Sequence, residues 1–212
     1  MSIKRILVGL DGSPLAEQVL GPVRALAEAL GAELTLLHVA HLPESFRATD
    51  DVTLDGIVAH ERRDAQSYLH RVARELESAG LAVRTAVAVG DAAAEIVHGA
   101  NRARSDLLAL ATHGRSSLQR WQHVSVADAV LHGTITPLLL VRPRVTAPTI
   151  GTVPRVIVPL DGSPLAEETL PMAREVARGL RAPLELLRVV EPLGLAFATD
   201  AYGGVLVDYP RL

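Results

Sequence analysis

The stretch Arg5-Ile-Leu-Val-Gly-Leu-Asp-Gly-Ser-Pro-Leu-Ala-Glu-Gln-Val-Leu20 occurs twice in the chain. Its second copy is Arg155-Val-Ile-Val-Pro-Leu-Asp-Gly-Ser-Pro-Leu-Ala-Glu-Glu-Thr-Leu170, so that Asp161 follows Asp11 by 150 residues. The same offset aligns Val39 with Val189 without a gap. The chain therefore contains an internal duplication.

Each copy predicts a strand, a turn and a helix. Residues 6–8 form a short apolar run of branched side chains, which is typical of a buried parallel strand. Gly12 permits a turn, Ser13 can cap a helix, and Pro14 suits a first helical position. Asp11 then stands at the carboxyl end of the strand, where parallel sheets usually bind ligands. Two interpretations of Asp11 are equally open: it braces the turn, or it contacts a ligand.

The composition is that of a globular protein. The chain has 212 residues, of which 49% are hydrophobic and 21% charged, and is long enough for one or two domains. A net charge of −3 and 3% aromatic residues argue against nucleic acid and against anionic membrane as partners. The absence of cysteine excludes disulfides and thiolate metal sites. No signal-peptide core precedes the first strand, so we expect a cytoplasmic protein.

Strands and helices alternate in the first part of the sequence. Strands are expected at residues 6–8, 34–39, 82–89, 106–111 and 136–142, and helices at 14–30, 56–79, 91–103 and 125–131, with a polar connection at 40–55. This alternation predicts an open, doubly wound, five-stranded parallel α/β sheet of the Rossmann-like type. Histidines such as His38 are expected to be partly buried or surface residues.

The duplication predicts a second, incomplete domain. We expect a domain at residues 1–143, a linker at 144–153 and a partial repeat at 154–212, which is a truncated β-α-β unit. This repeat lacks a counterpart of residues 81–142 and therefore lacks the loop after the fourth strand. Three elements bury a smaller fraction of their surface than a full domain does. The repeat should therefore lean on the first domain or on another subunit, or be loosely ordered.

The loop after the fourth strand is the second candidate for chemistry. Its backbone N–H groups precede a helix N-terminus, which favours an anion. Gly114 permits close approach, Thr112 and Ser125 offer hydroxyl groups, and His113 and Arg115 could meet negative charge. In a doubly wound sheet Asp11 and Gly114 would face one cleft. The residues alone support an anion site and an ordinary polar loop equally.

Other catalytic and metal-binding patterns are missing from the sequence. Neither a Walker A motif nor a dinucleotide fingerprint G-x-G-x-x-G is present. There is no G-x-S-x-G elbow and no H-E-x-x-H helix, and the eight histidines are scattered without ligand spacing. We therefore predict no catalytic residue and no metal ligand.

The motifs together resemble the universal stress protein family. They are Ile6–Ser13, Leu36–Val39, Thr112–Ser116, and Ser125–Ala127 followed by Thr136–Pro143. The resemblance covers residues 3–143 and the beginning of a second domain. It implies a stress-response or signalling protein that forms a homodimer or a higher homo-oligomer through its last strand. It also implies binding of ATP, or of ADP or AMP, with Mg²⁺ only alongside the nucleotide, and no dedicated enzymatic activity.

The resemblance also implies the residues of a nucleotide site. The adenine and ribose region would be Gly9, Leu10, Asp11, Gly12, Ser13 and Val39, with Asp11 accepting hydrogen bonds from the ribose hydroxyls. The phosphate region would be Ala111, Thr112, His113, Gly114, Arg115, Val124, Ser125 and Val126.

The phosphate motif departs from that of the family at two positions. The family pattern is G-x-x-G, nine residues, then G-[ST], and its marked positions fall on Ala111, Gly114, Val124 and Ser125. Ala111 adds only a methyl group. Val124 is a branched residue where the backbone needs space or a positive φ, which costs about 1–3 kcal/mol, or roughly 5- to 150-fold in affinity. These departures leave four possibilities open: the site binds nucleotide weakly, it prefers a nucleotide with fewer phosphates, it is empty, or it binds another ligand.

Two functions are compatible with these residues. The first is a nucleotide-binding stress-response module, which Asp11, Gly114 and Ser125 favour. The alternative is a nucleotide-independent interaction protein that acts through its dimer edge and partial repeat, which Val124 and the missing half-domain favour. An ATP-consuming enzyme is not favoured, because no carboxylate pair or cation-binding constellation lies near the loop.

Overall fold

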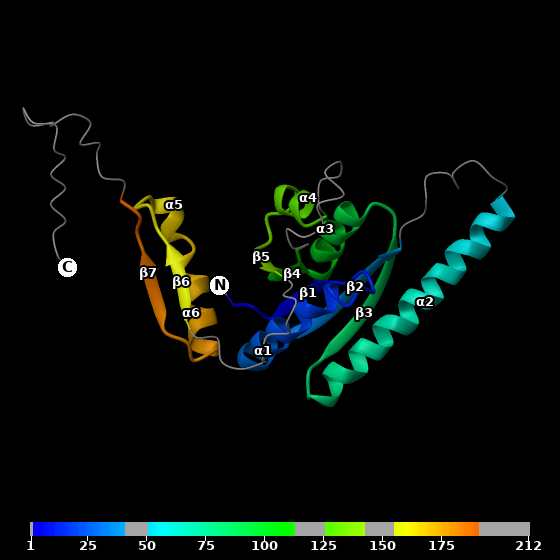
Figure 1. The fold of residues 1–212 in the computed structure, drawn as a ribbon, viewed down its shortest axis with the longest axis horizontal. Helices are drawn as coiled ribbons and strands as arrows, with labels where there is room; N and C mark the ends of the chain where they lie inside the picture. Colours follow the sequence, from blue (N-terminus) through cyan, green and yellow to red (C-terminus); the bar gives the residue numbers. More distant parts are fainter. Residues whose placement is uncertain (1, 41–50, 113–125, 143–154, 191–212) are drawn as a thin grey trace, which may run out of the picture.

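The computed structural model describes residues 2–40, 51–112, 126–142 and 155–190, with the backbone alone at residues 51–55 and 57. It contains a five-stranded sheet with helices on both faces and a smaller two-stranded sheet to one side (Figure 1). The predicted linker at 144–153 and the end of the predicted repeat, residues 191–212, lie outside the described residues.

The larger sheet is parallel throughout. Its strands are β1 (Arg5–Gly9), β2 (Glu33–Ala40), β3 (Val83–Val89), β4 (Leu107–Ala111) and β5 (Leu138–Val141). Their order is β3-β2-β1-β4-β5, and every neighbouring pair runs in parallel. The prediction of an open, doubly wound, five-stranded sheet is confirmed. The order reverses between β1 and β4, so the loops that follow these two strands are neighbours at the carboxyl edge.

Helices cover both faces of this sheet. Helices α1 (Leu20–Leu30) and α2 (Asp51–Ser78) pack on one face, and α3 (Ala92–Ala103) and α4 (Val126–Gly133) pack on the other. Alternate residues of β1 enter the two cores: Ile6 and Val8 face α1 and α2, whereas Leu7 lies in the core under α3 and α4. Burial on both faces explains why the central strands are continuously apolar.

The first predicted helix is divided into two segments. The sequence predicts one helix over residues 14–30, but a 3-10 turn, η1 (Ala16–Val19), precedes α1. Pro22 is the third residue of α1 and has no N–H to donate to the carbonyl of residue 18, which weakens continuous α-helical bonding through the join. The predicted cap is present, since Ser13 Oγ accepts from the amide of Ala16 at 3.1 Å. Gly31 ends α1 with a φ of 61°.

The predicted start of the longest helix is wrong. The sequence predicts a polar connection up to residue 55 and a helix from Gly56, but α2 begins at Asp51. Glycine has a low helix propensity, and a helix of 28 residues tolerates one. The last strand is shorter than expected, because β5 begins only after Pro137. The other strands and helices of this domain lie within about three residues of their predicted positions.

The smaller sheet contains two parallel strands. The chain forms β6 (Val156–Pro159), α5 (Pro164–Glu167), α6 (Leu170–Gly179) and β7 (Leu184–Leu187), and β6 pairs with β7. The expected order of strand, helix and strand is present, with the helix in two segments. β7 ends at Leu187.

Helix α6 joins the smaller sheet to the first domain. It lies between β6–β7 and α1 (Figure 1). Met172 and Val176 pack against the core under α1 and α2. Glu175 Oε1 accepts a hydrogen bond from the amide of Ile3, just before β1, at 2.9 Å. Of the arrangements expected for the strand pair, the structure has the one in which it leans on the first domain.

Candidate functional site

A cavity lies at the carboxyl edge of the sheet, where the strand order reverses. Its volume is about 110 Å³. It is lined by Gly9, Leu10, Asp11, Ala16, Leu37, Val39, Ala92, Ile96, Leu110, Ala111, Val126 and Ala127. Six of the predicted site residues are among them: Gly9, Leu10, Asp11, Val39, Ala111 and Val126. Residues from β1, β2, β4 and α4, which are far apart in the sequence, are thus brought together as expected.

The floor of the cavity depends on Gly9. A Cβ atom at this position would lie 2.5 Å from Leu110 Cδ2 and 3.5 Å from Ile96 Cδ1. The glycine therefore allows Leu110 of β4 to rest directly on the backbone of β1. The walls are mainly aliphatic, which suits a flat, uncharged ring better than a charged group.

Asp11 lies at the mouth of the cavity. Its Oδ1 accepts a hydrogen bond from the amide of Ser13 at 2.9 Å, and Gly12 between them has a φ of 84°. Asp11 therefore braces the turn with one oxygen. No described residue donates a hydrogen bond to its Oδ2. The two interpretations of Asp11 are thus compatible, because the second oxygen can still accept from a ligand.

The other predicted site residues differ in how far the structure describes them. Gly12 and Ser13 form the turn beside Asp11 without lining the cavity. Thr112 is half-buried, and its amide donates to the carbonyl of Val141 at 2.8 Å, so this N–H is already bonded. The remaining predicted site residues, which are His113, Gly114, Arg115, Val124 and Ser125, lie outside the described residues.

A polar cluster on the α2 side of the sheet is not recognisable as a unit in the sequence. The rings of His38 and Tyr68 meet edge to face with centroids 6.0 Å apart, and the guanidinium of Arg71 lies 5.3 Å from the Tyr68 ring centroid. Arg71 Nη2 also contacts Glu17 Oε1 at 2.8 Å. The half-burial of His38 agrees with expectation, but Tyr68 is not among the predicted site residues. Periodicity alone cannot pair these two residues.

Burial controls the ionisation of this cluster. It lowers the pKa of His38, and the negative charge of Asp11 and the backbone of Leu10 oppose that shift. Burial, followed by the negative charge of Glu17, raises the pKa of Tyr68. Both rings are therefore favoured in their neutral forms beside Asp11.

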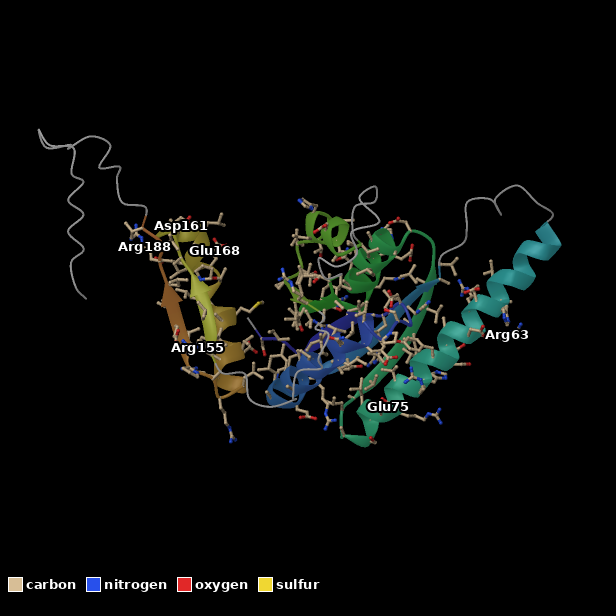
Figure 2. All side chains as sticks on the ribbon, in the orientation of Figure 1. Arg63, Glu75, Arg155, Asp161, Glu168 and Arg188 are labelled. Carbon is tan, nitrogen blue, oxygen red and sulfur yellow. The ribbon has the colours of Figure 1, made fainter. Side chains whose placement is uncertain are left out.

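The second copy of the duplicated stretch forms the same turn. Asp161 Oδ1 accepts from the amide of Ser163 at 2.8 Å, and Ser163 Oγ accepts from the amide of Ala166 at 3.1 Å. The hydrogen bonds from Ser163 hold the pKa of Asp161 below its usual range against the opposing effect of desolvation, and the positive charge of Arg188 adds a smaller contribution. Asp161 and Arg188 lie at the same end of β6–β7 (Figure 2). Arg188 stands where the first copy has His38.

Other parts of the described structure give few further candidates. Open hollows of about 580 and 760 Å³ lie along β3, and neither is lined by Asp11. Within the described residues, no three His, Asp or Glu side chains are grouped so that they could hold a metal ion. None of the described helices is both long enough and apolar enough to cross a membrane.

Comparisons with known proteins agree with this architecture. The model of the universal stress protein family matches residues 2–142. Universal stress protein YxiE of Bacillus subtilis is 26% identical over 147 residues, which is 65% of this chain and 98% of the relative. A crystal structure of a universal stress protein from Archaeoglobus fulgidus has a TM-score of 0.71 at 23% identity and covers 89% of this chain and 68% of its own. A universal stress protein in complex with cAMP has a TM-score of 0.53 at 19% identity, over 68% of this chain and 100% of its own. The chain belongs to the universal stress protein family.

Proposed function

We propose that this protein is a stress-response module that binds an adenine nucleotide in the cleft at the carboxyl edge of the first domain. The observation that carries the proposal is the meeting of six predicted residues around one cavity, with Asp11 at its mouth. A largely aliphatic wall suits a base, and a carboxylate oxygen without a described donor suits the ribose hydroxyls.

The size of the cavity sets how much of the ligand it would hold. Its volume of about 110 Å³ is below the roughly 300–1,000 Å³ of sites that enclose a whole small molecule. The described walls therefore suit one part of a nucleotide, and we place the base there. The phosphates would follow the segment between Thr112 and Val126. The family member in complex with cAMP supports an adenine nucleotide as the ligand.

We infer a binding role and not a dedicated enzymatic one. Asp11 is the only ionisable side chain among the described residues that line the cavity. General acid–base catalysis needs at least one positioned proton donor or acceptor matched to the reacting group. A single carboxylate that already braces a turn is better suited to holding a hydroxyl group. The cytoplasmic location stays a prediction.

We also propose that residues 154–212 are a partial second repeat. Val156 pairs with Leu184 as Ile6 pairs with Leu34, at the same offset. The amide of Leu160 donates to the carbonyl of Leu187 at 2.8 Å, as that of Leu10 donates to Leu37 at 2.9 Å. These equivalent bonds support a common origin for the two parts.

The resemblance to the family further supports a homodimer through β5. This strand lies at the end of the sheet, and Leu140 in it is 39% exposed. An exposed apolar edge strand is prone to pair with another chain. The alternative function, interaction without a nucleotide, is supported by the apolar surface that β6 and β7 expose.

Calorimetric titration with ATP, ADP and AMP, each with and without Mg²⁺, tests the nucleotide site. We expect heat of binding from the wild type and none from Asp11→Ala. A wild-type protein that binds none of the three nucleotides would leave the interaction role as the better account.

A further inference from the structure

Strand β3 has a free edge along its whole length. It stands at one end of the strand order of the larger sheet, and no described strand pairs beyond it. It contains seven residues, whereas the other strands at the ends of the described sheets, β5, β6 and β7, contain four each. Natural proteins often protect edge strands by shortness or by proline. β3 is long for an edge strand and contains no proline.

The register of β3 identifies the backbone groups at its free edge. The amide of Leu34 in β2 donates to the carbonyl of Ala82 at 2.8 Å, and Leu34 aligns with Val83. Since parallel ladders use alternate residues, the even-numbered residues of β3 bond to β2. The odd-numbered residues turn their N–H and C=O groups to the free edge, and these are Val83, Thr85, Val87 and Val89.

Hollows lie beside this edge on both faces of the sheet, and Thr85 lines three of them. On the face of α2, which runs alongside β3 (Figure 1), their volumes are about 580 and 240 Å³. On the face of α3, the volume is about 760 Å³. Successive side chains of an added strand would point to the two faces in turn. Both faces therefore offer room for them.

The side chains that line these hollows are more often cationic than acidic. The arginines are Arg5, Arg62, Arg74, Arg84 and Arg102, and the acidic residues are Glu33 and Glu77. This excess contrasts with the net charge of −3 of the chain. Three of the arginines are already paired, Arg5 with Asp106, Arg84 with Glu33 and Arg102 with Glu95. Arg62 and Arg74, both on α2, form no ion pair with a described residue.

The two unpaired arginines lie towards opposite ends of the edge. Arg62 shares a hollow with Val87, and Arg74 shares one with Val83. Twelve helical residues separate the two arginines by about 18 Å, and a strand of seven residues spans roughly 20 Å. Glu77 lines the hollow of Arg74, whereas no acidic residue lines that of Arg62. Arg62 should therefore attract an anionic group more strongly.

We propose that the free edge of β3 binds an extended, acidic segment of a partner protein as an additional strand. The edge backbone would hold the segment by main-chain hydrogen bonds, and the hollows would accept its alternate side chains. Acidic side chains on the α2 face would meet Arg62 and Arg74. A separation of about 18 Å corresponds to about six residues of extended chain. We therefore expect two acidic residues about six positions apart, both on one face of the segment.

The charges disfavour a second copy of this chain at the same edge. If the β3 strands of two copies paired antiparallel in one continuous sheet, their α2 helices would lie on the same face and approach each other. Arg62 of one copy would then lie opposite Arg74 of the other. Like charges in such positions oppose association. An acidic partner is the better match for this edge.

Affinity selection from a random peptide library against the full chain supplies the probe. We expect the enriched peptides to carry two acidic residues about six positions apart and to bind with a Kd of about 1–100 µM, measured by fluorescence anisotropy. Arg62→Glu should weaken binding at least about 10-fold, and Arg74→Glu should weaken it less. Arg174→Glu, the same charge change at an exposed position of α6, should leave binding unchanged.

Hydrogen exchange tests whether the peptide pairs as a strand. In the free chain the amides of Thr85 and Val87 should exchange faster than those of Ala86 and Ala88, which donate to β2. The selected peptide should slow exchange at Thr85 and Val87 at least about 10-fold. Thr85→Pro removes an edge N–H without removing a bond to β2, and it should weaken peptide binding at least about 10-fold. Circular dichroism checks the fold of this variant.

Three results would overturn the proposal. A library from which the chain enriches no peptide would show that the edge does not accept a strand. Selected peptides that bind Arg62→Glu and Thr85→Pro as tightly as the wild type would occupy another surface. Amides of Thr85 and Val87 that are already protected in the free chain would mean that another part of the same chain covers the edge.

Discussion

Leu110 of β4 rests on the backbone of Gly9 in β1, so that a Cβ atom on Gly9 would lie 2.5 Å from Leu110 Cδ2. In the second copy the equivalent position is Pro159, and no described strand pairs with that edge of β6. The glycine is required where a neighbouring strand approaches, and the proline is tolerated where none does. The floor of the cavity therefore depends on β4, which lies beside β1 and has no described counterpart beside β6.

Gly9→Ala should destabilise the first domain. Because the added methyl group overlaps Leu110, we expect the free energy of unfolding to fall by about 1–3 kcal/mol. Urea unfolding measures the change. Gly133→Ala is the matched control, because a Cβ atom there would be 3.7 Å from Val97, an ordinary contact. Equal stability of the two variants would mean that Leu110 does not rest on the backbone of Gly9 in solution.

Glu175→Ala should loosen the contact between α6 and the start of β1. The amide of Ile3 donates to Glu175 Oε1, and loss of one such bond costs about 0.5–1.5 kcal/mol. We expect faster hydrogen exchange at the amide of Ile3. Glu175→Gln keeps an acceptor and should exchange slowly. Glu168→Ala, on the second copy away from this contact (Figure 2), should behave as the wild type. An unchanged exchange rate at the amide of Ile3 in Glu175→Ala would mean that α6 does not make this contact with the start of β1 in solution.

Stability should depend on the ionisation of His38. Burial lowers its pKa in the folded protein below the ordinary value of 6.5, so the unfolded chain binds a proton more readily. The contribution of His38 is therefore complete above about pH 6.5 and is lost as the pH falls below it, until the folded pKa is reached. Urea unfolding between pH 5 and 8 should give a smaller pH slope in His38→Gln than in the wild type. The exposed variant His70→Gln should keep the full slope, and equal slopes in all three proteins would exclude this role of His38.

Val124→Gly should tighten nucleotide binding. The prediction rests on the sequence, since Val124 lies outside the described residues. Relief of about 1–3 kcal/mol of strain corresponds to a gain of roughly 5- to 150-fold. Ala111→Gly, which removes only a methyl group, is the control and should change the dissociation constant by less than about 3-fold. Equal effects of the two changes, measured by calorimetry, would contradict the assignment of Val124 as the limiting residue.

The larger sheet is predictable from the sequence because each strand carries its own signal. β1 and β4 are continuous apolar runs, and the duplication marks the turn at Asp11. Periodicity is less informative where two signals conflict. Pro22 divides a helix that the apolar pattern continues, and Gly56 lies inside α2 although its low helix propensity predicts a boundary there.

The site is predictable only as far as local motifs reach. Gly9, Asp11 and Val39, which the motifs single out, line one cavity. The motifs do not reveal that His38 contacts Tyr68, because that contact joins β2 to a residue of α2 that lies 30 positions later in the chain. The exposure of Ile157 is also beyond the sequence, since β6 has the same apolar pattern as the buried β1.

The central claim is that the cleft beside Asp11 binds an adenine nucleotide, and calorimetric titration of Asp11→Asn with ATP and AMP tests it most directly. Asparagine keeps an oxygen for the amide of Ser13 but loses the charge offered to the ribose. Asp161→Asn makes the same change in the second copy. We predict that Asp11→Asn binds about 10- to 150-fold more weakly than the wild type, with an unchanged melting temperature, and that Asp161→Asn binds normally. Wild-type affinity in Asp11→Asn, or a wild type that binds neither nucleotide, would contradict the claim.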